Sequence, residues 1–401
     1  MTYKSNPRSA ATVGLNRALL DPLSRRSFLL GVGGAAAMGT FAAACGSNGA
    51  SGSQSSSSPA KLAKAKVDGD LNILTWEGYI PQPVLDSFKK EYKVNINYSF
   101  IASEQEILRK LGSGQEFDLV FLDSTLINQS VDAGILQPVD HSQLKNYSEV
   151  LPYFQTPPYA PTADLNTRNA PYVGFPYATA AVGLAYRADK VTGMTGSFSD
   201  LWTQKEMAKG KTMVVDSADL ALAVAFAHLG LSLDTESQKD YDAAVAALRE
   251  LKPFLSGFGS VETKQDMVEG NGWLLTSYAG SVYSAIPEMS TGEDLRFQYC
   301  KESALYGCDN ACIPSAAKHP GSALLLMDWM LEPLNMAACV NSIAYIVPTK
   351  TGVDTYNALV KNFEWLKTDA TQLTNPKSWN KSRTAAQRKM QDAAWVEVKA
   401  G

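Results

Sequence analysis

Residues 71–100 read LNILTWEGYIPQPVLDSFKKEYKVNINYSF, and this stretch decides the fold class. Its opening residues are apolar and typical of a buried strand, and residues 83–92 place their apolar side chains on one helical face. In residues 94–100 apolar and polar side chains alternate, which is the period of a half-buried strand. The order strand, helix, strand predicts an α/β fold with a mostly parallel sheet.

The same kind of pattern continues over the rest of the chain. The residues from about 66 to 401 are enough for two α/β lobes, and clefts between lobes are favoured ligand sites. Further strands are predicted at residues 117–122, 179–186, 212–215, 273–277, 297–300 and 305–313. Helices are predicted at residues 103–111, 126–133, 220–229, 241–251, 322–331 and 334–340, and after Gly280.

The N-terminal segment carries an export signal. The pair Arg25-Arg26 precedes an apolar stretch, which is the twin-arginine pattern, and three alanines precede Cys45 as in a bacterial lipobox. We expect residues 1–44 to be a signal peptide and Cys45 to be lipidated at the outer face of the cell membrane or in the periplasm. Ala42 stands where lipoboxes usually have leucine, so a retained membrane helix and cleavage without lipid stay open.

The residues after Cys45 predict a spacer and an acidic mature body. Residues 46–59 are almost all small or polar, so we expect residues 45–66 to be a flexible linker. Residues 1–44 carry five basic and one acidic residue, so the net charge of −4 becomes −8 once they are removed. An acidic chain disfavours nucleic acid as a partner and weakly suits a cationic solute.

Four cysteines remain after Cys45. An even number in an oxidising compartment predicts one or two disulfides, with the pairing left open. The rival interpretation is a zinc site, but the sequence has no C-x2-C pair, so we expect no metal and no cofactor. The four residues are Cys300, Cys308, Cys312 and Cys339.

Motifs of known enzymes are scarce in this sequence. It holds no P-loop, no G-x-G-x-x-G, no G-x-S-x-G and no H-E-x-x-H, and its three histidines stand without partner motifs. Carboxylates are plentiful, but nothing in the sequence selects a catalytic pair. The absence of a nucleophile and base favours a binding protein over an enzyme.

Two turns that follow predicted strands hold candidate binding residues. Trp76 and Tyr79 come just after the first strand, where rings can flank a cation, although Trp76 can equally pack on the core edge. Asp123, Ser124 and Thr125 follow the strand at residues 117–122. A carboxylate there can pair with an ammonium group, or it can cap the next helix.

In their order and spacing, these residues resemble the bacterial spermidine/putrescine-binding proteins, the solute receptors of polyamine ABC importers. The resemblance covers most of residues 68–400. It is carried by Trp76-Glu77-Gly78-Tyr79-Ile80-Pro81, Phe117-Asp118-Leu119-Val120, Ala133-Gly134-Ile135-Leu136-Gln137-Pro138-Val139-Asp140, Ser199-Asp200-Leu201-Trp202, Ala311-Cys312-Ile313-Pro314, Ile343-Ala344-Tyr345 and Pro348-Thr349.

The resemblance implies a two-lobed periplasmic-binding-protein fold of type II, with discontinuous lobes joined by crossing strands. It places one lobe at residues 67–180 and 309–344 and the other at residues 181–308 and 345–401, with a third crossing near Tyr345. It also implies a solute cage between the lobes, a permease partner and a monomer. The implied cage residues are Trp76, Glu77, Tyr79, Asp123, Ser124, Thr125, Tyr278 and Asp309.

Other positions depart from the family pattern. The family often carries an acidic pair where Ser217 and Leu220 stand, while Asp216 and Asp219 lie one residue earlier, and a family glutamine is replaced by Ala338. A one-residue shift turns a helical side chain by about 100°. We therefore expect a receptor for a polyamine or a related amine-bearing solute. A receptor of the same fold for another solute and a lipid-anchored surface hydrolase are the alternatives.

Overall fold

The computed structural model describes residues 62–101, 104–155, 157, 174–260, 263–290, 292–302, 305–368 and 383–400. These residues belong to one compact unit, Ala60–Gly401. The predicted signal peptide, the predicted lipidation site Cys45 and most of the predicted linker lie outside them.

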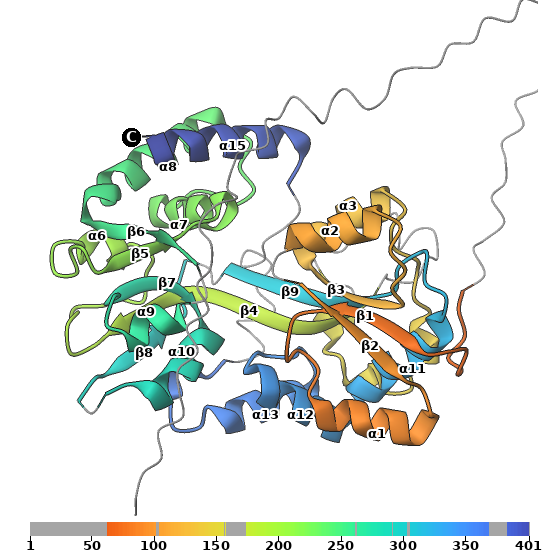
Figure 1. Ribbon diagram of the computed structural model, residues 1–401. Coiled ribbons are helices and arrows are strands. Elements are labelled where there is room, and N and C mark those ends of the chain that lie inside the picture. The colour runs from red at the N-terminus through yellow and green to blue at the C-terminus, as the bar shows by residue number, and fades with distance from the viewer. Residues whose placement is uncertain are drawn as a thin grey trace, which may run out of the picture. The chain divides into compact units, whose positions relative to one another are not determined.

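The described strands form one nine-stranded sheet (Figure 1). Its order is β2-β1-β3-β9-β4-β7-β5-β6, and β8 pairs with β4 off this path. The strands are β1 (Leu71–Thr75), β2 (Ile96–Phe100), β3 (Leu119–Asp123), β4 (Gly174–Arg187), β5 (Thr212–Val215), β6 (Leu255–Gly259), β7 (Leu274–Tyr278), β8 (Leu295–Gln298) and β9 (Leu305–Cys312).

The sheet is mixed, which corrects the expectation of a mostly parallel one. The groups β2-β1-β3 and β7-β5-β6 are each parallel. Between them, β9 runs antiparallel to β3 and to β4, and β4 runs antiparallel to β7. The reason is that β4 and β9 run between the two parallel groups in opposite directions, so each is antiparallel to the strands beside it.

The crossing strands predicted from the family resemblance are confirmed. Strand β4 pairs with β9 from Gly174 to Val182 and with β7 from Val182 to Tyr186, so it belongs to both groups. The predicted third crossing also contacts it, because the backbone N–H of Thr179 donates to the carbonyl of Ile346 over 2.7 Å. The two groups of strands are therefore the two halves of a two-lobed α/β fold.

Helices cover both faces of the sheet, and α7, α8 and α15 pack on one another over β5 and β6 (Figure 1). The helices predicted from periodicity are confirmed to within a few residues. The helices are α1 (Gln82–Tyr92), α2 (Glu104–Gly112), α3 (Ser124–Asp132), α4 (Pro152–Gln155), α6 (Asp200–Thr203), α7 (Ala218–Leu229), α8 (Gln238–Leu251), α9 (Lys264–Val268), α10 (Ala279–Ala285), α11 (Pro320–Leu331), α12 (Pro333–Ile343), α13 (Lys350–Leu359) and α15 (Ala385–Ala400).

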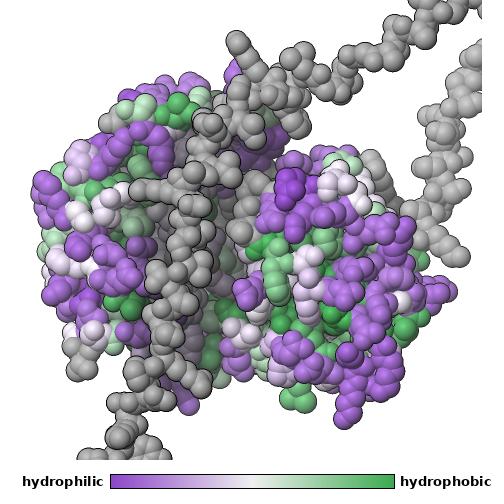
Figure 2. Space-filling model, viewed as in Figure 1, coloured by the Kyte–Doolittle hydropathy of each residue, from purple (hydrophilic) through white to green (hydrophobic). Residues whose placement is uncertain are grey.

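The buried apolar side chains form two cores. On β7, Leu274 belongs to the second core and Leu275 to the first, because successive strand residues face opposite sides of the sheet. The first core extends from the β1 region under β7, while the second lies beneath α7 and α8. The two cores lie on opposite faces of the sheet as well as beside different strands, so they do not mark where one lobe ends and the other begins. The predicted lobe boundaries therefore stay a prediction. Hydrophilic side chains cover most of the surface seen in Figure 2.

Within the described ranges, no single helix has the length and apolar character needed to cross a membrane. The helices α11 and α12 pass that test only as a pair, and they are bent by 82° at the break between them.

The structure contradicts the predicted disulfides. No disulfide joins the four cysteines that it describes, and all four thiols are buried. Cys308 and Cys312 lie four residues apart on β9, about 13 Å along a strand, whereas bridged Cα atoms lie about 4–7 Å apart. Cys300 belongs to the second core and Cys339 to the first. Each of the four thiols instead packs within an apolar core.

Candidate functional site

Two of the carboxylates predicted to bind solute, Asp123 and Asp309, lie side by side. Asp123 ends β3, and Asp309 lies opposite it on β9 as its antiparallel register partner. Directly opposed residues have Cβ atoms about 4.5–5.5 Å apart and point to the same face of the sheet. The structure thus brings two predicted site residues together at one point, and we call them the carboxylate pair.

Asp123 has the capping role that the sequence left open, while its pairing with an ammonium group stays a prediction. As the N-cap of α3, its Oδ1 accepts a hydrogen bond from the backbone N–H of Thr125 over 2.8 Å and one from the Thr125 hydroxyl over 2.6 Å. Its Oδ2 lies only 2.8 Å from where a Cβ on Gly307 would stand. The glycine on β9 therefore leaves room for the second carboxylate oxygen.

Tyr79 holds the other member of the pair. Its phenolic O–H donates to Oδ2 of Asp309. The turn that carries it includes Gly78 with φ of +74°, a backbone conformation that side chains rarely adopt. The hydroxyl of Tyr177 donates to the backbone carbonyl of Tyr79 over 2.6 Å, and the two rings pack 5.2 Å apart. Tyr79 is thus fixed by its neighbours and aimed at the carboxylate pair.

Burial raises the pKa of both carboxyl groups of the pair. Burial, and then the charge of Asp123, raise the pKa of Asp309 to about 7, while the hydrogen bond from Tyr79 opposes the shift. Burial also raises the pKa of Asp123, against the hydrogen bonds from Thr125. Both residues are half-buried. A cation between them would remove the repulsion.

Two further tyrosines lie near Tyr79. Tyr278, at the end of β7, packs edge-on against Tyr345 with ring centroids 6.1 Å apart. Tyr345 is close enough to contribute electrostatically to the raised pKa of Tyr79. A Cβ on Gly280 would stand 2.9 Å from the ring of Tyr345, so that glycine lets the ring lie against the start of α10.

A third carboxylate faces the pair from α7. Asp219 contributes to the raised pKa of Asp123, which places it near the site. Its Oδ1 lies 3.1 Å from Nε of Arg383, whose side chain is only 9% exposed. Asp219, which stands one residue before an acidic position of the family, therefore forms an ion pair with Arg383.

The remaining predicted residues have different surroundings. Trp76 is half-buried and packs on the first core, which favours the structural role that the sequence left open, and Glu77 is exposed. Ser124 is fully buried, and its hydroxyl accepts a hydrogen bond from the backbone N–H of Cys308 over 3.3 Å. Thr125 supports Asp123. A binding role for these four residues stays a prediction.

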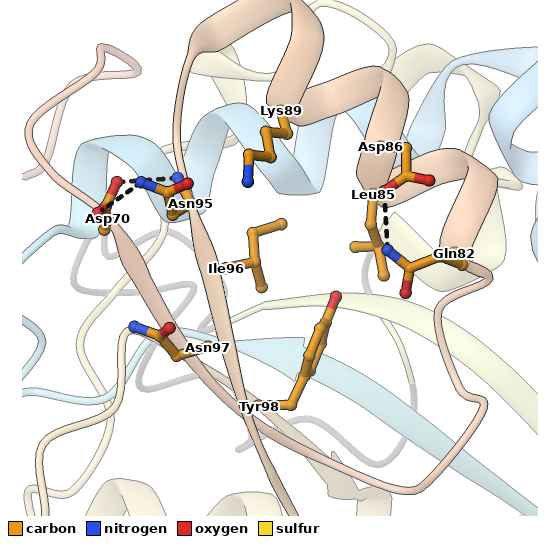
Figure 3. A pocket seen from close by; sticks show the side chains of 9 residues that line it. All are labelled: Asp70, Gln82, Leu85, Asp86, Lys89, Asn95, Ile96, Asn97 and Tyr98. Carbon is orange, nitrogen blue, oxygen red and sulfur yellow. Dashed lines mark hydrogen bonds between the residues drawn. The ribbon is translucent and has the colours of Figure 1, made fainter.

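A surface pocket lies away from this site, between α1 and the edge strand β2, with a volume of about 420 Å³ (Figure 3). Its carboxylates already accept hydrogen bonds, that of Asp86 from the Gln82 side chain over 2.8 Å and that of Asp70 from Asn95. None of the predicted site residues lines it. The lining residues are Asp70, Gln82, Leu85, Asp86, Lys89, Asn95, Ile96, Asn97 and Tyr98.

Sequence reasoning missed some residues of the site. The sequence indicates Tyr345 only as part of the third crossing, and it gives no signal for a role of Tyr177 or Gly307 in the site. Tyr177 lies at an irregularity between Pro176 and Ala178, where β4 shifts register against β9. Bulges of this kind re-aim side chains near functional sites, but they leave no clear mark in the sequence.

Comparisons with known proteins show the family and the fold. The family model described as bacterial extracellular solute-binding protein matches residues 84–388. The spermidine/putrescine-binding periplasmic protein of Escherichia coli (strain K12) is 27% identical over 316 residues, which are 78% of this chain and 87% of that protein. The putrescine-binding periplasmic protein PotF of the same strain is 25% identical over 307 residues, 73% of this chain and 81% of that protein.

A solved structure shares the fold. It is the spermidine/putrescine ABC transporter substrate-binding protein PotD from Streptococcus pneumoniae, in complex with calcium and HEPES. The match has a TM-score of 0.70 at 21% sequence identity and covers 83% of this chain and 99% of that one. The two-lobed periplasmic-binding-protein fold predicted from the sequence is confirmed.

Proposed function

Because the chain belongs to the family of bacterial extracellular solute-binding proteins, we propose that it is the receptor of an ABC importer for an amine-bearing cationic solute. The observation that carries the proposal is the carboxylate pair, Asp123 and Asp309, with the Tyr79 hydroxyl on it. The relatives named above are polyamine-binding proteins, and their name supports the same class of solute.

The pair suits an ammonium group on physical grounds. A hydrogen bond to a charged group contributes about 1.5–3 kcal/mol, more than one between neutral groups. An ammonium group carries three N–H donors and a positive charge, so it satisfies both carboxylates at once. An anion would instead face two acidic side chains, which disfavours anionic solutes. Binding requires no covalent step, so the proposal assigns the protein no enzymatic activity.

The proposal includes the anchor and the partner. The twin-arginine pattern and Cys45 support export and a lipid tether, and residues 46–59 support a flexible spacer above the membrane. The receptor would act as a monomer and deliver its solute to a permease, with the two halves of the sheet closing on the solute as a hinge. The length of the crossing strand β4 supports such a hinge, since it belongs to both halves.

Thermal unfolding of the purified protein with putrescine, spermidine, glucose and sulfate tests the proposal. A solute that binds only the folded state at 100 times its Kd stabilises the protein by about 2.7 kcal/mol. We expect stabilisation by the amines and none by sulfate or glucose. The Asp309→Asn variant should lose about half or more of the amine effect, while the exposed Asp242→Asn on α8 should keep it. Stabilisation by sulfate or glucose alone would refute the proposal.

A further inference from the structure

We infer that the site grips a single ammonium group and that the far end of the solute is neutral. This inference rests on the proposed function and narrows the class of solute. A linear diamine held by carboxylates at both ends would be the alternative. Three observations carry the inference: the position of the carboxylate pair, the partner of Asp219, and the tyrosines at the other end of the site.

The first observation is that both carboxylates of the pair converge on one point. One oxygen of Asp123 is used by Thr125, and one oxygen of Asp309 is used by Tyr79. Oδ2 of Asp123 faces the space above Gly307, and Oδ1 of Asp309 accepts no described hydrogen bond within the residues that the structure covers. Two acceptors on adjacent strands match the donors of one ammonium group, not of two separated ones.

The second observation is that Asp219 already has a cation of its own. The Arg383 side chain reaches Asp219 with Nε and the backbone carbonyl of Leu233 with Nη1 over 2.7 Å. It also lies 3.4 Å from a carboxylate oxygen of Asp234. A second ammonium group would have to displace this nearly buried guanidinium, and separating a buried ion pair leaves an uncompensated charge.

The neighbouring acidic residue is also paired. Both oxygens of Asp216 lie within 2.8 Å of Nζ of Lys399 on α15. Lys399 further lies over the rings of Phe258 and Trp395, at 5.1 and 5.3 Å. This pair is exposed, so it contributes less than the Arg383 pair, but it acts in the same direction. Both relocated acidic side chains are thus neutralised by the C-terminal segment.

The third observation is the aromatic far end. Along β4, Asp309 lies opposite Ala178, and Tyr278 lies opposite Val182. Four residues of a strand span about 13 Å, and residues i and i+4 face the same side. We infer that the solute extends from the carboxylate pair toward the rings of Tyr278 and Tyr345, which pack on each other and offer apolar contact.

Calorimetric titration with matched four-carbon amines tests the inference. Putrescine carries two ammonium groups, 4-amino-1-butanol carries one ammonium group and one hydroxyl, and n-butylamine carries one ammonium group. We expect the Kd of 4-amino-1-butanol to lie within about threefold of that of putrescine. A preference for putrescine of 100-fold or more would overturn the inference while leaving the proposed function intact. Failure of all three amines to bind would overturn both.

Two variants locate any second ammonium site. Asp219→Asn should leave the Kd for putrescine within about twofold, whereas a loss of tenfold or more would show that Asp219 holds solute and overturn the inference. Arg383→Gln should free Asp219 and shift the ratio of the two Kd values at least fivefold toward putrescine. If that variant does not fold, Asp219→Asn still decides.

A putrescine preference that disappears in Glu77→Gln would place the second carboxylate at Glu77, against the inference.

Discussion

The aspartates at the two ends of strand β3 differ in the hydrogen bonds that their carboxylates accept. Asp118, just before the strand, is 1% exposed and accepts backbone N–H groups of Asn72, Lys318 and His319 over 2.8–2.9 Å. Asp123, at the other end, has one oxygen capped by Thr125 and the other over Gly307. A carboxylate whose oxygens all accept backbone hydrogen bonds stabilises the fold. A carboxylate with an oxygen that accepts no described hydrogen bond can still bind a solute.

The difference follows from the direction of the strand. Ligands in α/β folds bind beyond the carboxyl ends of strands, and Asp123 lies at that end of β3. There a crossing strand brings a second carboxylate opposite it. At the amino end, the loop before α11 closes around Asp118 and provides two of its three donors.

The largest expected effect is on stability at the amino end. Asp118→Ala leaves three backbone N–H groups without the buried carboxylate that accepts from them, so the free energy of unfolding should fall by about 3 kcal/mol. Urea denaturation measures this, with Asp86→Ala as a control, since Asp86 is exposed and bonded only to Gln82 among the described contacts. Where Asp118→Ala remains folded, its putrescine Kd should match that of the wild type. A large change in Kd without loss of stability would reverse the comparison.

The next effect is on binding at the carboxyl end. Asp309→Asn removes one charge from the pair, so the Kd for amines should rise about 10- to 100-fold, which is about 1.4–2.8 kcal/mol. Calorimetric titration measures it, with Asp242→Asn as the matched control. The free energy of unfolding should not fall, because the variant also removes repulsion from Asp123. Unchanged amine affinity would exclude Asp309 from the site.

A third effect concerns the stability of the solute-free protein against pH. Folding raises the pKa of Asp309 from 3.8 to about 7, so between these values the folded state binds more protons than the unfolded state. The contribution of Asp309 to stability is therefore complete below pH 4 and lost as pH rises through 7. Urea denaturation of wild type and Asp309→Asn across this window measures the difference. Identical pH profiles would contradict it.

The smallest effect is expected from the hydroxyl that holds the pair. Tyr79→Phe removes the donor to Asp309, so the pKa of Asp309 should rise further and the Kd for amines at pH 7 should increase about threefold. Titration at pH 7 and pH 8.5 separates the causes, because deprotonation of Asp309 at the higher pH should recover part of the loss. An equal loss at both pH values would assign Tyr79 a packing role alone.

Local patterns made much of the fold predictable. Residues 71–100 form β1, α1 and β2 as their periodicity indicates, because each element buries one continuous face. Strand β6 escaped prediction, since its five residues include two glycines and none of them is buried. Helix α15 also escaped prediction, because three buried side chains among 16 residues give a weak stripe. Its packing on α7 and α8 depends on contacts far along the chain.

The site was predictable where it depends on strand ends. Asp123 and Asp309 were both named from the sequence, Asp123 by its strand end and Asp309 by the family resemblance. Their position opposite each other follows from the antiparallel β3 and β9 ladder, which the expectation of a mostly parallel sheet excluded. The partner of Asp219 was hidden because Arg383 stands 164 residues away in the chain.

Proton release on binding tests the central claim most directly. If an ammonium group binds between Asp123 and Asp309, it favours their charged forms, so binding near pH 6.5 should release protons. Calorimetric titration of putrescine in two buffers with different ionisation enthalpies counts those protons. We expect release of about half a proton or more in the wild type and clearly less in Asp309→Asn. Tight amine binding with no proton release, or with proton uptake, would contradict the claim that this pair holds the solute.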